Sequence, residues 1–151
     1  GAFGEWPYYK EGATRPAEKR DFMSVYSAQL RDMIKKGCDH PTSYERPLEG
    51  FRIVVDAGNG AGGFFADDVL KPLGADTQGS QFLNPDGMFP NHVPNPEDAQ
   101  AMEMTIKATL DNKADLGIIF DTDVDRSAVV DATGKGINRN RLIALLSTIV
   151  L

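Results

Sequence analysis

Two short apolar runs lie six residues apart in the second half of the chain, LGIIF at 116–120 and SAVVD at 127–131. Runs of this length and composition are typical of strands. A parallel connection between two strands needs a dozen or more residues, so a six-residue loop predicts an antiparallel pair. This hairpin is the strongest constraint on the fold.

Upstream of the hairpin, strand-like and helix-like segments alternate. FRIVVD at 51–56 predicts a strand, 64–73 an amphipathic helix, 75–83 a second strand, and 97–110 another helix. Such alternation is typical of α/β proteins, in which helices cover both faces of a parallel sheet. We therefore predict a three-layer α/β/α fold with a mixed, mostly parallel sheet of about four strands, the last one antiparallel.

Two more helices are predicted outside this core. Residues 21–37 repeat apolar side chains every three or four positions, with Asp21 as the N-cap and Gly37 as the left-handed closing residue. Residues 140–151 are also helical by pattern, and because the chain ends inside this helix we expect a piece of a longer protein. The predicted division is a tail or linker remnant at 1–20, a linker helix and connector at 21–50, and one α/β domain at 51–151.

Charge and cysteine content exclude several classes of function. The net charge of −6 falls entirely within residues 51–151, where eight basic side chains face fourteen acidic ones. An acidic domain binds phosphate backbones and anionic membranes poorly, so no nucleic-acid or membrane partner is expected. Cys38 is the single cysteine, which excludes an internal disulfide and favours a cytoplasmic protein.

Three carboxylates alternate in the loop of the hairpin: Asp121, Asp123 and Asp125. Negative charges crowded in this way repel one another unless a cation holds them. Mg²⁺ binds carboxylate oxygens, and Mn²⁺ can substitute for it. Arg126 adds a guanidinium group that suits phosphate. We favour a metal site over the alternative, a solvated acidic turn.

Other metal loops fit this pattern less well. An EF-hand requires glycine and glutamate where Arg126 and Ala132 stand. A haloacid-dehalogenase-type phosphatase or a sugar-nucleotide transferase would use Asp121 and Asp123 and leave Asp125 unexplained. Both remain alternatives as metal-dependent enzymes of the Asp-x-Asp type.

Two further segments carry weaker signals. Gly58, Gly60 and Gly63 satisfy the dinucleotide-binding pattern G-x-G-x-x-G, but a tight turn between strand and helix explains them as well. We favour the turn and keep a non-catalytic dinucleotide-binding module as an alternative. The proline-rich loop at 84–96 contains His92, which could contact a substrate or hydrogen-bond the loop to the rest of the chain.

Taken together, these segments resemble domain 2 of the α-D-phosphohexomutase family, the phosphoglucomutases and phosphomannomutases. The resemblance covers about residues 48–151. The matching stretches, in the family's order, are FRIVVDAGNGAGG, LGAD, PDGMFPNHVPNPE, KADLGIIFDTDVDRSAVVD and GKGINRNRLIAL.

The resemblance implies a function. Asp121, Asp123 and Asp125 match the three Mg²⁺ ligands of the family's Asp-Gly-Asp-Gly-Asp-Arg loop, and Arg126 matches its arginine, while Thr122 and Val124 replace the two glycines. Such enzymes interconvert hexose 1-phosphates and 6-phosphates through a phosphoserine and a bisphosphate intermediate. The phosphoserine belongs to another domain of the same protein. The expected partners are therefore a hexose phosphate and the other domains, and this chain alone should be inactive.

Overall fold

The computed structural model describes residues 18–137, 140, 142–144 and 147. Three strands form one mixed sheet in the order β1 (Ile53–Asp56), β2 (Leu116–Phe120) and β3 (Ser127–Asp131). β1 runs parallel to β2, and β3 runs antiparallel to β2, with Phe120 opposite Ser127 next to the loop. The predicted antiparallel hairpin is confirmed.

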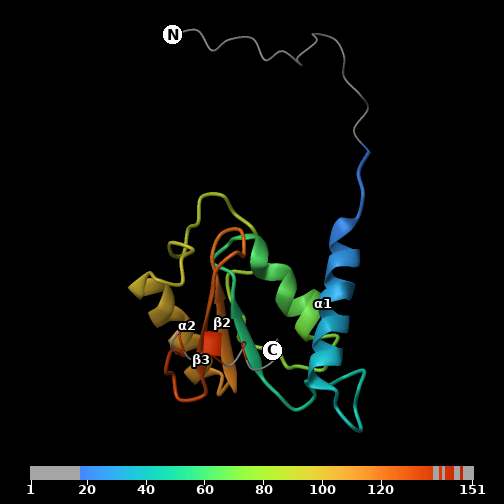
Figure 1. Cartoon of the computed structure of the whole chain (residues 1–151). Helices are drawn as coiled ribbons and strands as arrows, with labels where there is room; N and C mark the ends of the chain where they lie inside the picture. Colours follow the sequence, from blue (N-terminus) through green and yellow to red (C-terminus); the bar gives the residue numbers. More distant parts are fainter. Residues whose placement is uncertain (1–17, 138–139, 141, 145–146, 148–151) are drawn as a thin grey trace, which may run out of the picture.

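Helical segments cover both faces of this sheet (Figure 1). Helix α2 (Ala99–Asp111) packs on all three strands from one side. The opposite side is covered by η2 (Phe65–Leu70), a short π-helix, and α1 (Phe22–Cys38) packs outside η2. The short 3₁₀ turn η1 (Ala61–Gly63) connects β1 to η2. The α/β architecture with helices on both faces is thus as predicted.

The residues of β1 divide between the two halves of the core. Ile53 and Val55 belong to the cluster on the η2 side, together with Leu70 and Phe120. Val54 packs on the α2 side with Ala108 and Ala114. Successive side chains of a strand point to opposite faces. Because both faces of β1 are buried, its sequence is an unbroken apolar run up to Asp56.

Helix α1 begins at the predicted N-cap, Asp21, but it ends at a different residue from the predicted Gly37. The Asp21 carboxylate accepts the backbone N–H of Ser24, which satisfies one of the free donors of the first turn. The helix runs one residue past Gly37, and Asp39 takes the left-handed conformation with φ of 40°. Aspartate tolerates this conformation better than most residues do, and its N–H bonds to the Lys35 carbonyl.

The segment 75–83 is not a regular strand, so the sheet has three strands where about four were predicted. The segment touches β1 through two isolated parallel bridges, Arg52 to Asp76 and Asp56 to Gln81. Between these bridges the chain turns, and Gly79 has a φ of 96°. A residue with that backbone geometry interrupts strand pairing.

The predicted C-terminal helix is only partly described. Asn140, Leu142–Ala144 and Ser147 are helical, and the other residues of 138–151 lie outside the described part of the chain. Within the described residues, none of the helices is long and apolar enough to span a membrane.

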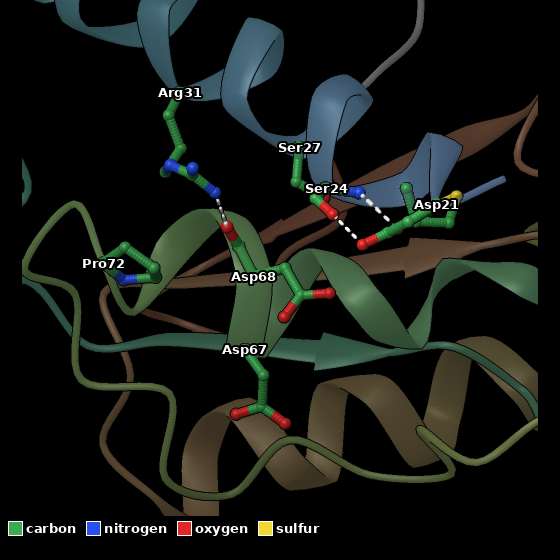
Figure 2. Close-up of a pocket in the computed structure, with 8 residues that line it drawn as sticks. Asp21, Ser24, Ser27, Arg31, Asp67, Asp68 and Pro72 are labelled. Atoms are coloured by element: carbon green, nitrogen blue, oxygen red, sulfur yellow. Dashed lines mark hydrogen bonds between the residues drawn. The ribbon is translucent and has the colours of Figure 1, made fainter.

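A hollow of about 460 Å³ lies in the seam between α1 and η2 (Figure 2). Arg31 reaches across the seam and donates to the Asp68 carbonyl. Ser27 is buried there, and its hydroxyl has no hydrogen-bond partner within the described structure. The residues labelled around the hollow are Asp21, Ser24, Ser27, Arg31, Asp67, Asp68 and Pro72. Residues 121–126 do not line it, so this hollow is separate from the predicted metal loop.

We expect Gly63→Ala to destabilise the fold by at least about 2 kcal/mol, since overpacking against rigid neighbours costs about 1–3 kcal/mol. A Cβ atom at this buried residue would lie 1.8 Å from the backbone carbonyl oxygen of Leu83. The matched control is Gly136→Ala, whose Cβ would meet nothing within 4 Å. That change should alter stability by no more than about 0.5 kcal/mol. Urea unfolding of both variants makes the comparison, and equal midpoints would contradict it.

Candidate metal centre

The loop between β2 and β3 brings the three predicted carboxylates together. It lies at the carboxyl end of β2 (orange, at the top of the sheet in Figure 1). Oxygen atoms of Asp121, Asp123 and Asp125 all lie within 4.8 Å of one another. Asp121 is buried, whereas Asp123 and Asp125 are exposed. The cluster therefore has one anchored carboxylate and two that face solvent.

Arg126 connects the loop back to its first residue. Its backbone N–H donates to Oδ1 of Asp121 over 3.0 Å, and its Nε donates to Oδ2 over 3.0 Å. The Asp121 N–H in turn bonds to the Arg126 carbonyl. Nε also lies 3.5 Å from Oδ1 of Asp125. Arg126 thus supplies the positive charge that lets the acidic loop close.

These contacts separate the titration of the carboxylates. Burial alone would raise the pKa of Asp121, but the Arg126 amide, the Asp125 carboxyl and the Arg126 guanidinium together lower it. The hydrogen bond with Asp121 and the charge of Asp123 raise the pKa of Asp125. The pKa shifts therefore favour the ionised form of Asp121 and disfavour that of Asp125, which carries the cost of crowding.

The glycine-rich turn after β1 packs against the predicted metal loop. The Ala61 N–H donates to the Thr122 carbonyl over 2.9 Å. A Cβ atom on Gly60 would lie 2.7 Å from that carbonyl oxygen, so only glycine allows this approach. Together with the close approach of Gly63 to Leu83, this contact favours the tight-turn interpretation of the glycines over a dinucleotide site.

His92 does not join the carboxylate cluster. Its side chain is fully buried, with Nε2 2.9 Å from Oδ1 of Asp56 and Nδ1 2.9 Å from the Val93 carbonyl oxygen. The geometry favours a role in holding its loop over contact with a substrate. Asp56 itself was missed at the sequence level. The available signal was a charged residue ending the apolar run FRIVVD directly before the glycine turn.

Comparison with known proteins identifies the family of the chain. The family model for phosphoglucomutase/phosphomannomutase, alpha/beta/alpha domain II, matches residues 30–134. The chain belongs to this family. It is 37% identical over 147 residues to a phosphomannomutase of Salmonella montevideo. That alignment covers 88% of this chain and 32% of the phosphomannomutase. It is 36% identical over 125 residues to a phosphoglucomutase of Neisseria meningitidis serogroup B, covering 83% and 27% respectively.

A solved structure extends the similarity to three dimensions. The crystal structure of a phosphoglucomutase/phosphomannomutase family protein from Burkholderia thailandensis aligns with a TM-score of 0.63 and 30% identity. The alignment covers 81% of this chain and 26% of that one. The chain thus spans about a quarter to a third of the length of the relatives it matches.

One residue of the loop 121–126 in this member of the phosphoglucomutase/phosphomannomutase family has a strained backbone. Val124 has a φ of 70°, a conformation in which a β-branched residue is a clear outlier. Its side chain packs against the core cluster on the η2 side. Packing on the core therefore offsets the strain at Val124.

The strain at Val124 can be measured with two variants. Val124→Gly and Val124→Ala both remove the packed isopropyl group, but only glycine relieves the backbone, which costs other residues roughly 1–2 kcal/mol in this region. We expect Val124→Gly to be more stable than Val124→Ala by about 1 kcal/mol, the reverse of their order in regular structure. Chemical denaturation of the two variants decides this. Alanine equal to or above glycine would show that the position is unstrained.

Proposed function

We propose that Asp121, Asp123 and Asp125 hold Mg²⁺ in the central domain of a phosphohexomutase. The parent protein would interconvert hexose 1-phosphate and 6-phosphate through a phosphoserine and a bisphosphate intermediate. The observation that carries the proposal is the convergence of three carboxylate oxygens within 4.8 Å at the carboxyl end of β2. Ligands of α/β proteins commonly bind at this edge of the sheet.

The ligand set fits a hard divalent cation. All three groups offer oxygen, which Mg²⁺ prefers over nitrogen or sulfur, and Mn²⁺ accepts the same ligands. Asp123 and Asp125 are exposed, so water and a phosphate oxygen can complete the coordination. When bound, the ion would offset negative charge on the phosphoryl group being transferred.

Arg126 would serve both the loop and the substrate. Its Nε bond to Asp121 fixes the direction of the guanidinium group, and half of its side chain remains exposed. Guanidinium groups bind phosphate oxygens through paired N–H donors. We propose that the outer nitrogens of Arg126 contact a phosphate next to the metal. Its role is thus to bind and orient, and the phosphoserine lies outside this chain.

The same proposal assigns the parts of the chain. Residues 51–151 would form the metal-binding domain, 21–50 its linker helix and connector, and 1–20 a tail or linker remnant. The packing of α1 on η2 supports a linker helix that stays attached to this domain. Other domains of the parent protein would supply the phosphoserine and the contacts to the sugar, in the cytoplasm.

Metal binding can be tested by adding Mn²⁺ to the ¹⁵N-labelled chain and recording paramagnetic broadening by NMR. We expect broadening centred on the amides of residues 121–126. Asp123→Asn should raise the Mn²⁺ concentration needed for the same broadening by at least about tenfold. The reason is that loss of residues even outside the ligand shell lowers metal affinity about 10–100-fold. Asp111→Asn is the control, because this exposed carboxylate pairs with Lys107 at the end of α2.

The third carboxylate separates the proposal from its main rival. In a site of the Asp-x-Asp type, Asp125→Asn would leave Mn²⁺ broadening unchanged. In the proposed site it should weaken broadening about as much as Asp123→Asn does. Broadening centred elsewhere, or unaffected by both substitutions, would contradict the proposal.

The purified chain should not convert glucose 1-phosphate or mannose 1-phosphate to the 6-phosphate. The reason is that the phosphoryl donor of the proposed reaction is a serine of another domain. A coupled assay with Mg²⁺ and a catalytic amount of hexose bisphosphate tests this, with an intact relative as the positive control. Turnover above the protein-free blank would refute the assignment of the serine to another domain.

A further inference from the structure

The His92 imidazole lies between two hydrogen-bond acceptors. Nδ1 is 2.9 Å from the backbone carbonyl oxygen of Val93, and a carbonyl cannot donate, so Nδ1 carries a proton. Nε2 is 2.9 Å from Oδ1 of Asp56. One more proton must lie between Nε2 and the carboxylate, since two facing lone pairs would repel.

The surroundings of Asp56 indicate where this second proton resides. Oδ1 also accepts the Gly58 N–H over 2.9 Å, and Oδ2 accepts the Gln81 amide over 2.8 Å. The Thr105 hydroxyl lies 3.1 Å from Oδ2. Donors on both oxygens stabilise the ionised form of the carboxylate. The proton therefore belongs to the ring.

We propose that His92 is a positioning residue, held as a doubly protonated imidazolium against the Asp56 carboxylate, which locks the loop 84–96 onto the turn after β1. The groups around the ring are Asp56 of β1, the ring of Phe82, and Gly58 with Pro94. Asp56 is the titratable group among them. The inference is independent of the metal and of the proposed reaction.

The turn after β1 connects His92 to the predicted metal loop, because it contacts both of them. Gly58 fits so tightly under the loop that a Cβ atom there would lie 2.9 Å from Pro94 and 3.0 Å from the His92 ring. The Asp86 N–H donates to the Asn59 carbonyl, and this hydrogen bond connects the start of the loop 84–96 to the same turn. The turn then meets Thr122 through Ala61. His92 thus positions the support behind the metal loop without touching it.

The second histidine of the chain provides an internal control. His40 accepts the backbone N–H groups of Thr42 and Ser43 on Nδ1, over 3.3 and 3.0 Å. Its Nδ1 therefore carries no proton, and the neutral tautomer protonated at Nε2 is expected. The two histidines should differ in their ring ¹⁵N spectra at neutral pH, with two protonated nitrogens for His92 and one for His40.

Long-range ¹H–¹⁵N correlation spectra of the unaltered chain test this without any substitution. Two protonated ring nitrogens for His92 would support the lock, and a bare Nε2 at neutral pH would overturn it. Hydrogen-exchange protection of the Asp86 amide, corrected for the intrinsic rate, reports whether the loop 84–96 stays attached to the turn after β1. Protection of the Ala114 amide, which bonds to Thr109 at the other end of the sheet, is the reference.

His92→Gln should lower the protection of the Asp86 amide by at least tenfold, because glutamine cannot bridge both acceptors with charge. His40→Gln is the matched control and should leave it unchanged. Unchanged Asp86 protection in a folded His92→Gln variant would overturn the positioning role. If that variant does not fold, the ring spectrum of the unaltered protein still decides.

Discussion

The fold is organised around a buried carboxylate. Asp56 ends β1 inside the protein, where an ionised group is costly unless several donors surround it. Its partners come from the turn at Gly58, from Gln81, from the loop at His92 and from α2 at Thr105. Four segments must therefore meet at one point before this charge is satisfied. The requirement brings these segments together at the carboxyl edge of the sheet, since a buried carboxylate without donors would be costly.

Sequence reasoning succeeded where the determining constraint is local. Six residues cannot carry a parallel crossover, so the direction of β3 followed from loop length, and Asp21 was identified as a cap from its place before an apolar helix. The carboxylates of the metal loop follow one another along the chain, so their convergence was also predictable. It failed at Asp56, whose partners Gln81, His92 and Thr105 stand 25, 36 and 49 residues away. The strand predicted at 75–83 is also absent, and the chain turns at Gly79 instead. This turn depends on tertiary contacts that the local pattern does not contain.

The glycine turn shows how one pattern can carry two meanings. Its spacing fits dinucleotide binding, yet each glycine has a close neighbour that a side chain would strike, namely Pro94, Thr122 and Leu83. A phosphate-cradling turn must instead leave its backbone open to the ligand. The glycines after β1 are thus occupied by the chain itself. Gly58 lies against the loop 84–96, and Gly60 lies against Thr122, so the turn contacts both loops.

The predicted metal loop, residues 121–126, contains two features that destabilise it. Three carboxylates repel one another, and Val124 holds a backbone conformation that suits glycine. Arg126 offsets the first feature by bonding to Asp121, and the packing of Val124 on the core offsets the second. In a loop that binds a cation, the carboxylates must stay close before the ion arrives. Backbone strain such as that at Val124 persists where the surrounding structure enforces it. The contacts of Arg126 and the packing of Val124 are therefore consistent with the proposal that the charges are kept together for a ligand.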